Sequence, residues 1–507
     1  MGDGHLTQTS DALHVAIDLG AGSGRAFVGG IGRAGLRFSE AHRFHYAPRR
    51  VDGHLRWDAG GLIDGLRTSL QRARDMAGNV ALPLVSIGVD SWGVDYAFVD
   101  ADGRLVEEPV CYRDERTDDA MERVFAVVSR REIFERTGIQ FHQFNTLYQL
   151  WAHVREGLPG GTRRLLLMPD FCHHVLCGSL VSERTNASTT QLLGVRTGQW
   201  DDVLFDRLGL PRHLMPEIVT AGTAIGTLRP ELCVDLGVGA MTVVAPGTHD
   251  TASAVAGTPL EPGWAYISSG TWSLVGVECD EPLLSGNVER TDLTNEAGVF
   301  GNVRLLTNVM GLWLLDSCRR EWEAEARGLD LSSLLAGVEL LPESAGVVFA
   351  DDRRFFAPES MVRALRGALR DTGQADTDDP VRLTKIILDS LALRYSAVVA
   401  AIEGVTGQTI PGIHIVGGGS MNAYLNQATA DASGREVLAG PVEATAAGNL
   451  LVQAIAAGTI GSLAEGRRLV ALANPPTRFE PRHPDRWARA ARVYGDIAAR
   501  ADAESQA

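Results

Sequence analysis

Two short runs of small residues, each placed between apolar, β-prone segments, constrain the fold of this chain more than any other feature. The first run, "AGSGR", joins "HVAIDLG" to "AFVGGI" across residues 14–31, and the second lies within "WAYISSGTWSLVGVE" at 264–278. Each pattern predicts two strands joined by a tight turn. Because the same arrangement opens both halves of the chain, we expect a duplicated α/β fold.

Other segments fit such a fold. Apolar residues at helical spacing predict a helix over 59–78 that ends at Gly78, and "LVSIGVD" (84–90) is typical of a buried strand. A hairpin is expected to turn at Asp102 and Gly103. A long helix is predicted from Pro380, with Asp379 as its N-cap and Gly404 at its exit.

The length of the chain predicts two domains. At 507 residues it exceeds the size at which one core usually stops growing. The segment "GTPLEPG" is rich in glycine and proline and is the expected linker and hinge, at 257–263. We therefore expect an N-terminal domain over 1–256, a C-terminal domain over 264–480 and a tail helix over 481–507.

Charge and hydropathy exclude several classes of partner. The formal net charge is −16 and there is no long basic run, so we expect no nucleic-acid partner. The chain starts with polar and acidic residues, and no later run reaches the roughly 18 apolar residues of a membrane span. We expect a cytoplasmic protein without a membrane partner.

The segment "CHHVLC" (Cys172 to Cys177) brings four potential zinc ligands into six residues. A helix here would turn successive residues to different faces, and C-x-x-C spacing is absent. Reduced, packed side chains are the favoured interpretation, and a metal site is the alternative. The other cysteines are scattered, which argues against a disulfide framework.

The first turn, "DLGAGSGR" (Asp18 to Arg25), could gather backbone amides around an anion, although a plain β-turn explains it equally well. A dinucleotide site would need a helix directly after the glycines, and the glycine-rich segment that follows does not favour one. No G-x-x-x-x-G-K-S/T occurs, so a P-loop is excluded.

Three further motifs suggest ligand contacts. "SSGTWS" (268–273) offers hydroxyls to phosphate oxygens, and "HIVGGGSMNAYLNQ" (414–427) offers bare backbone to a flat ring, with close helix packing as the alternative. "DSWGVD" (90–95) places a carboxylate, an indole and a glycine at a strand end, a combination that suits a sugar. In "HDTASAV", we expect Asp250 at the start of a helix whose positive end keeps the carboxylate ionised.

Taken in order, these pieces resemble the FGGY family of carbohydrate kinases. The resemblance also rests on "VCYRDERT", "RTGIQFHQFNTLYQL", "TNASTTQLLG", "NVMGLWLL" and "AGPVEATAAGN", and it runs from residue 14 to about 460. It implies two actin-like or ribonuclease H-like ATPase domains around an interdomain cleft. It also implies transfer of the γ-phosphate of ATP to the 1-hydroxyl of a ketose, first of all L-rhamnulose. L-fuculose and xylulose are the alternative sugars.

The resemblance further implies roles for individual residues. Asp250 matches the catalytic base, and Asp18 is the candidate for holding Mg²⁺, through water. The sugar-binding positions are Gly93, His249, Asp250, Thr251 and Asn308. The ATP-binding positions are Ala21, Gly22, Ser23, Gly24 and Arg25 in the first phosphate loop, Thr271 in the second and Gly418 at the adenosine site.

Two positions depart from the family pattern. Gly22 stands where relatives have serine, which removes a hydroxyl but leaves the backbone amide. Asp316 stands where relatives often carry an amide that helps to bind nucleotide, so that role is not assigned. An actin-like ATPase without a sugar substrate is the alternative from another class, and an NAD oxidoreductase is disfavoured by the expected hairpin. We expect a monomer or a homodimer.

Overall fold

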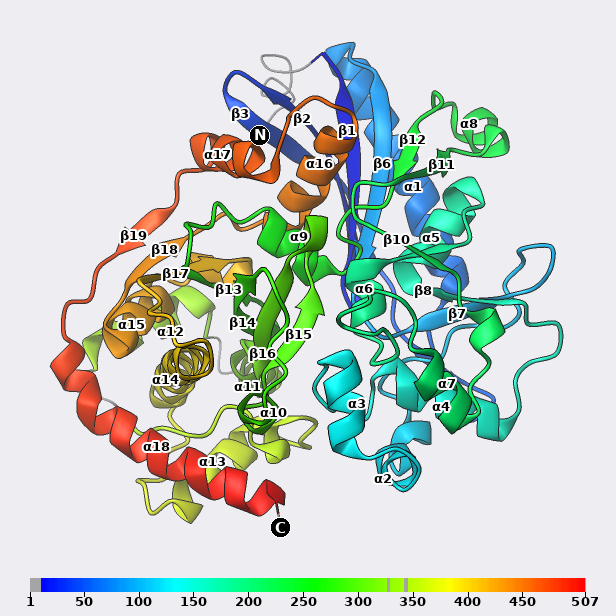
Figure 1. The fold of residues 1–507 in the computed structure, drawn as a ribbon. Coiled ribbons are helices and arrows are strands. Elements are labelled where there is room, and N and C mark those ends of the chain that lie inside the picture. Colours follow the sequence, from blue (N-terminus) through cyan, green and yellow to red (C-terminus); the bar gives the residue numbers. More distant parts are fainter. Residues whose placement is uncertain (1–10, 326–328, 342–344, 507) are drawn as a thin grey trace. The chain divides into compact units, whose positions relative to one another are not determined.

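The computed structural model describes residues 11–325, 329–341 and 345–506, which form two compact units (Figure 1). The first unit contains the described residues up to Pro259, together with Glu278–Leu305 and Ala444–Pro475. The second contains Leu260–Val277, Leu306–Glu443 and the described residues from Pro476 onward. The units are therefore not the two consecutive stretches expected from the sequence, because 278–305 and 444–475 pack with the first.

Close helix packing explains why the segment from Ala444 belongs to the first unit. Helix α16 (Ala444–Ala456) lies against α9 (Asp250–Ala256). A Cβ atom at Gly448 would lie 1.8 Å from the carbonyl oxygen of Ser253, and one at Gly257 would lie 2.0 Å from that of Ala444. Only glycine allows the two backbones to approach so closely.

The first unit is built on a six-stranded sheet in the order β11-β12-β6-β1-β2-β3. Strands β1 (Leu13–Leu19), β2 (Ser23–Gly32) and β3 (Gly35–His45) form an antiparallel meander. Strands β6 (Leu84–Ser91) and β12 (Thr242–Val244) run parallel to β1, and β11 (Ala224–Thr227) pairs antiparallel with β12. The parallel strands bring their carboxyl ends to one edge of the sheet.

Alternation along β1 separates two cores. Leu13, Val15 and Ile17 pack with α1 (Ala59–Val80) and α5 (Met168–Cys177) on one face of the sheet. Ala16 packs with α16 and α17 (Leu463–Ala473) on the other. Because side chains alternate between the faces of a strand, the apolar run of β1 serves both layers.

The second unit repeats the opening of the first. Strands β13 (Ala265–Ser269) and β14 (Trp272–Cys279) form an antiparallel hairpin, and β17 (Gly412–Val416) runs parallel to β13. The sheet order is β15-β16-β14-β13-β17-β18-β19, of which β15 (Thr294–Ala297) and the start of β16 (Val303–Met310) belong to the first unit. Strands β18 and β19 span Glu436–Ala439 and Thr477–Phe479. The paired hairpins confirm the duplicated fold.

The second unit contains several helices, of which the long helix from Pro380 was predicted. They are α11 (Trp313–Ala324), α12 (Leu331–Leu340), α13 (Met361–Asp371), α14 (Pro380–Thr406), α15 (Ala423–Ser433) and α18 (Pro484–Gln506). Asp379 caps α14 as predicted, but the helix continues past Gly404 and ends at Gly407, whose φ of 68° is left-handed. Likewise α1 continues past Gly78 to Val80. In both helices the residue that adopts the left-handed conformation sets the end.

The predicted hairpin at Asp102 and Gly103 and the "CHHVLC" helix both lie in the first unit. Strand β7 (Tyr96–Val99) leads into the hairpin, and Gly103 has a φ of 77°. In α5, Cys172 is fully buried, His173 Nε2 accepts from the amide of Val89 at 3.0 Å, and His174 Nε2 contacts the Gly103 carbonyl at 2.8 Å. Within the described residues, no group of three or more histidine, cysteine or acidic side chains could hold a metal ion.

The remaining elements of the first unit form a subdomain around β7 and β8 (Arg164–Leu167). It contains α2 (Ala120–Phe125), α3 (Arg130–Thr137), α4 (Thr146–Glu156), α6 (Arg184–Ser188) and α7 (Asp202–Leu208). Among residues 11–325, 329–341 and 345–506, none of the helices is both long enough and apolar enough to cross a membrane.

Candidate active site

Three carboxylates meet at the carboxyl edge of the first sheet. Asp18 on β1 lies directly beside Asp90 on the parallel strand β6, and Ser91 forms a parallel bridge with His249. The next residue, Asp250, begins α9. The charges of Asp18 and Asp250 both act on Asp90, so the three side chains form one electrostatic group.

Asp18 is paired with the arginine of the first turn. Arg25 lies opposite Asp18 on β2, and its Nη2 donates to Oδ2 of Asp18 at 2.5 Å. Burial raises the pKa of Asp18, and the neighbouring Arg25 charge opposes that shift. The guanidinium of Arg25 thus partly offsets the effect of burial on the Asp18 carboxyl, in favour of its ionised form.

Asp90 is fully buried and is held from α16. Asn449 Nδ2 donates to Oδ2 of Asp90 at 2.5 Å, and Gln453 Nε2 donates to the Asn449 amide oxygen at 2.6 Å. Burial, together with the charges of Asp18 and Asp250, raises the pKa of Asp90 well above its usual range. Burial and the two neighbouring charges therefore favour the protonated form of Asp90.

Asp250 is the half-buried carboxylate of this group. Its Oδ1 accepts from the amide of Thr251 at 2.6 Å and lies 3.5 Å from Nε2 of His249. Burial is the largest influence and, with the charge of Asp18, raises the pKa of Asp250 to about 6, against the lowering by His249. The start of the seven-residue helix α9 does not offset burial, but a pKa of about 6 still leaves Asp250 mainly ionised at neutral pH.

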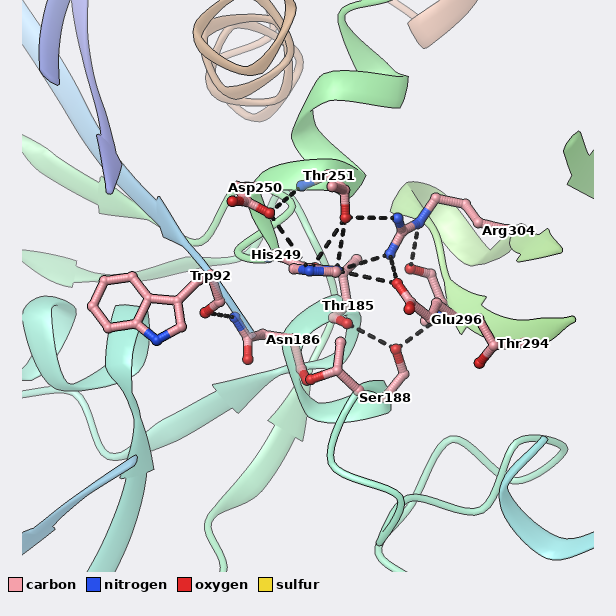
Figure 2. A network of polar contacts seen from close by, with 12 residues as sticks. Trp92, Thr185, Asn186, Ser188, His249, Asp250, Thr251, Thr294, Glu296 and Arg304 are labelled. Carbon is pink, nitrogen blue, oxygen red and sulfur yellow. Dashed lines mark hydrogen bonds and ion pairs between the residues drawn. The ribbon is translucent and has the colours of Figure 1, made fainter. Parts of the chain in front are cut away.

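The two neighbours of Asp250 belong to a buried network (Figure 2). His249 Nδ1 lies 3.2 Å from Oε2 of Glu296 and 3.1 Å from Nη2 of Arg304. Thr251 Oγ1 accepts from Nη1 of Arg304 at 3.0 Å and lies 3.0 Å from His249 Nδ1. The side chains on both sides of Asp250 are therefore bonded to each other and to Arg304, and His249 also contacts Glu296.

Helix α6 anchors the backbone that leads to Asp250. Glu183 Oε2 accepts from the amide and the hydroxyl of Thr248 at 2.9 and 2.8 Å, and Thr185 Oγ1 accepts from the amide of His249 at 3.1 Å. Asn186 Nδ2 donates to the carbonyls of Trp92 and Thr248 at 3.2 and 3.3 Å. These bonds join the "DSWGVD" segment to the segment that carries Asp250.

Gly93 and Asp95 explain the composition of the "DSWGVD" segment. A Cβ atom at Gly93 would lie 2.8 Å from Oγ1 of Thr189, so this backbone tolerates no side chain without a shift. Asp95 accepts from the indole nitrogens of Trp57 at 2.6 Å and Trp92 at 3.0 Å. The acidic residue thus orients two aromatic rings and is not itself placed as a proton acceptor.

The loop predicted to bind phosphate, residues 21–25, is compact and internally bonded. The amide of Gly22 donates to the Gly20 carbonyl at 2.8 Å, and the amide of Gly20 donates to the Ser23 carbonyl at 2.9 Å. No heavy atom lies within 4 Å of a Cβ built on Gly22, whereas one on Gly24 would lie 2.3 Å from the Phe44 ring. Ala21, Ser23 and Arg25 are half-buried and Gly22 is exposed.

The predicted ATP-binding residues of the second unit lie on two adjoining loops. Strand β13 pairs with β17, and the loops that follow them carry Thr271 and Gly418. A Cβ atom at Gly419 would lie 2.0 Å from Oγ of Ser269, whereas one at Gly418 would have no heavy atom within 4 Å. The chain is therefore closely packed at Gly419, whereas the space beside the backbone of Gly418 is free of other protein atoms.

Two other predicted positions also lie in the second unit. Asn308 is half-buried on β16. Asp316, the departure from the family pattern, lies on α11 and forms an exposed ion pair with Arg319 at 3.4 Å. No nucleotide role is assigned to Asp316.

Family models match both parts of the chain. The N-terminal domain of the FGGY family of carbohydrate kinases matches residues 13–257, and the C-terminal domain of the same family matches residues 265–457. The chain belongs to the FGGY family of carbohydrate kinases.

Curated relatives and solved structures agree with this membership. The FGGY kinase is 43% identical to the rhamnulokinase of Pectobacterium carotovorum subsp. carotovorum over 92% of this chain and 93% of that protein. It is 37% identical to the rhamnulokinase of Bacillus subtilis over 94% and 96%. Its fold matches a xylulose kinase from Lactobacillus acidophilus with a TM-score of 0.81 at 13% identity, covering 97% of this chain and 98% of that one. The fold also matches the structure of glycerol kinase from Plasmodium falciparum with ADP, with a TM-score of 0.77 at 15% identity and the same coverage of both chains. The two-domain actin-like fold predicted from the sequence is confirmed.

The structure brings most of the predicted residues of this FGGY kinase together within each unit. Gly93, His249, Asp250 and Thr251 are joined in the first unit through α6, and Asp18 acts electrostatically on Asp250. Sequence reasoning missed Asp90 as a buried partner, and it missed Asn449, Glu296 and Arg304 altogether. Asn449 ends the motif "AGPVEATAAGN", so the sequence did point to this residue. No sequence pattern pointed to the pairing of Glu296 with Arg304.

The carboxylates of this FGGY kinase fit Mg²⁺ better than a soft metal. Asp18, Asp90 and Asp250 offer only oxygen, and Mg²⁺ needs one or two carboxylates besides substrate phosphates and water. Asp90 is bonded to Asn449 and its charged form is disfavoured by burial, so Asp18 is the residue that could hold the ion.

Proposed function

We propose that this FGGY kinase is a rhamnulokinase, which transfers the γ-phosphate of ATP to the 1-hydroxyl of L-rhamnulose. The half-buried carboxylate of Asp250, held between two fixed polar side chains, carries the proposal of an activated sugar hydroxyl. The choice of sugar is supported by the two rhamnulokinases that are 43% and 37% identical over most of the chain.

Asp250 acts as the general base in this reaction. As the sugar oxygen forms its bond to the γ-phosphorus, the hydroxyl proton passes to the carboxylate of Asp250. The bond between the γ-phosphorus and the bridging oxygen breaks, and ADP leaves with that electron pair. A base of this kind typically contributes about 100-fold to 10,000-fold to the rate. A pKa of about 6 leaves Asp250 mainly ionised at neutral pH while keeping it basic enough to accept the proton.

Each unit carries residues that the proposal assigns to nucleotide binding. In the first unit, the 21–25 loop and the guanidinium of Arg25 meet the phosphate charge, since the chain has no P-loop lysine. In the second unit, Thr271 faces the phosphates and the open backbone of Gly418 lies against the adenosine. Mg²⁺, when bound with ATP beside Asp18, would neutralise charge on the phosphate oxygens.

The six cysteines are free thiols, which supports a reducing compartment and hence a cytoplasmic enzyme.

The proposed activity is tested by coupled ADP release with L-rhamnulose, L-fuculose, L-xylulose and D-xylulose, and with no sugar. We expect L-rhamnulose to give the highest kcat/KM. A tenfold preference for another ketose would overturn the substrate, and sugar-independent ATP hydrolysis at the same rate would overturn the kinase.

A further inference from the structure

A fully buried arginine lies behind the sugar-binding residues of the first unit. Arg304 on β16 is 1% exposed, and its Nη2 donates to Oε2 of Glu296 on β15 at 2.9 Å. Burial alone would raise the pKa of Glu296, but the charge of Arg304 and the bond to His249 bring it down to about 2. A buried ion pair is rarely more stabilising than apolar packing of similar volume, so stability alone does not account for it.

The partners of this ion pair are the residues on either side of Asp250. Arg304 reaches Thr251 through Nη1 at 3.0 Å and His249 through Nη2 at 3.1 Å, while Glu296 Oε2 lies 3.2 Å from the same imidazole nitrogen. The other imidazole nitrogen of His249 faces Oδ1 of Asp250 at 3.5 Å. Figure 2 shows the guanidinium and the carboxylate on the opposite side of the imidazole from Asp250.

Helix α6 holds both the backbone next to Glu296 and the backbone of His249. Ser188 Oγ accepts from the amide of Ala297 at 2.9 Å, next to Glu296, and Thr185 Oγ1 accepts from the amide of His249 at 3.1 Å. Arg304 Nε donates to the Ala297 carbonyl at 3.2 Å. The backbones that carry Glu296 and His249 are therefore set relative to each other through one helix.

We propose that Glu296 and Arg304 are positioning residues that hold His249 and Thr251 in their sugar-binding orientation beside Asp250. The inference rests on the proposed function, since it assigns His249 and Thr251 to the sugar. The pair touches the imidazole and the hydroxyl on the sides away from Asp250, so both groups are oriented before the sugar binds. Misplacing a reactive or binding group by about 1 Å can cost about 100-fold in rate.

The test is a double-mutant cycle. Glu296→Gln keeps the size of the side chain and removes its charge, and Arg304→Lys keeps the charge and removes the planar fork. Each is made alone and with His249→Ala, and kcat and KM are measured for the sugar that the wild-type protein phosphorylates fastest, and for ATP. We expect each single variant to lower kcat/KM for the sugar about 10-fold to 100-fold, with the KM for ATP within about twofold.

In the His249→Ala background, Glu296→Gln is expected to cost less than about threefold, because the imidazole that it positions is gone. Arg304→Lys is expected to cost less there than in the wild type but to keep part of its effect, because Arg304 also bonds Thr251. Equal losses in both backgrounds would overturn the proposal, and so would unchanged sugar kinetics in the single variants. Glu296→Gln keeps the test informative if Arg304→Lys does not fold, as shown by its melting temperature.

Glu278 and Arg467 provide a matched control in the same unit. Their ion pair, at 2.9 Å, is half-buried, and Arg467 also bonds the Val255 carbonyl at the far end of α9, but neither residue is bonded to His249. Glu278→Gln is expected to leave sugar kinetics within about twofold. A loss equal to that of Glu296→Gln would show that any buried pair near α9 has the same effect.

A readout without sugar separates this proposal from the proposed function. In protein with ¹⁵N-labelled histidine, the imidazole N–H signal of His249 is identified as the one that disappears in His249→Ala. This signal is expected in the wild type and in Glu278→Gln. It is expected to be lost by exchange with water in Glu296→Gln and Arg304→Lys. Its persistence in both variants would overturn the positioning role, whereas failure of every ketose in the kinase assay would overturn only the function.

Discussion

Oδ1 of Asp250 accepts a hydrogen bond from the amide of Thr251 at 2.6 Å, although the same carboxylate is the proposed proton acceptor of the reaction. The bond uses one oxygen and orients the other. Asp250→Asn keeps this geometry and removes the base. We expect kcat to fall by about 100-fold to 10,000-fold, with the Kd for ADP unchanged within about twofold. A variant that retains more than a tenth of the wild-type rate would exclude Asp250 as the base.

The raised pKa of Asp250 predicts the acid limb of the pH profile. Because the base must be ionised, kcat/KM for the sugar should rise about tenfold per pH unit below about 6 and level off above it. The profile should be measured with a sugar and a coupling system that do not titrate in this range. A flat profile between pH 5 and 7 would contradict the assignment.

The same pKa predicts an effect on stability. A carboxyl whose pKa is raised on folding is less stable ionised in the folded protein, so its contribution to stability falls as pH rises from about 4 to about 6. Asp250→Asn is therefore expected to raise the melting temperature at pH 7.5 and to change it less at pH 4.5. An equal change at both pH values would show that packing, not charge, is responsible.

Gly22 and Gly24 predict opposite outcomes for the same substitution. Gly22→Ser meets no atom within 4 Å and should leave the melting temperature and the KM for ATP near wild type. Gly24→Ser would place its Cβ 2.3 Å from the Phe44 ring, against which Gly65 is also closely packed. We expect Gly24→Ser to lower the melting temperature by several degrees, and thermal unfolding of both variants measures the difference.

Gly418 and Gly419 separate nucleotide binding from folding in the second unit. Gly418→Ala has space in the free protein, so its melting temperature should be unchanged while the KM for ATP rises. Gly419→Ala would overlap Ser269 and should lower the melting temperature. If Gly418→Ala left the KM for ATP unchanged, the adenosine would have to bind elsewhere.

Asp18 predicts the metal dependence. Chelation with EDTA should abolish turnover, and added Mg²⁺ should restore it. Asp18→Asn keeps an acceptor for Arg25 but removes the charge, so its activity should fall most at limiting Mg²⁺. Asp102→Asn, on an exposed hairpin, is the control. A loss that is independent of Mg²⁺ would assign Asp18 to the phosphate loop alone.

Local patterns in the sequence were sufficient for the strands of the two opening hairpins, for the strand at 84–90 and for the helix that starts at Asp250. Glycine turns and apolar alternation act over a few residues, so they are visible without a fold. The helix ends at Ala81 and Gly407 were misjudged because the conformation of a single residue decides them. The assignment of 444–475 to the first unit was missed because it depends on contacts of Gly448 and Asn449 with residues far away in the chain.

The sequence by itself determined the family, the duplicated strand-turn-strand plan and the acidic residue beside His249 and Thr251. Only the tertiary structure decided the pKa shifts of the carboxyl groups at the candidate site. Burial sets the pKa of Asp250 at about 6, and burial together with the charges of Asp18 and Asp250 raises the pKa of Asp90. It also decided that Glu296 and Arg304 support His249. Desolvation and charge pairing depend on what surrounds a group in space, and no spacing along the chain encodes that.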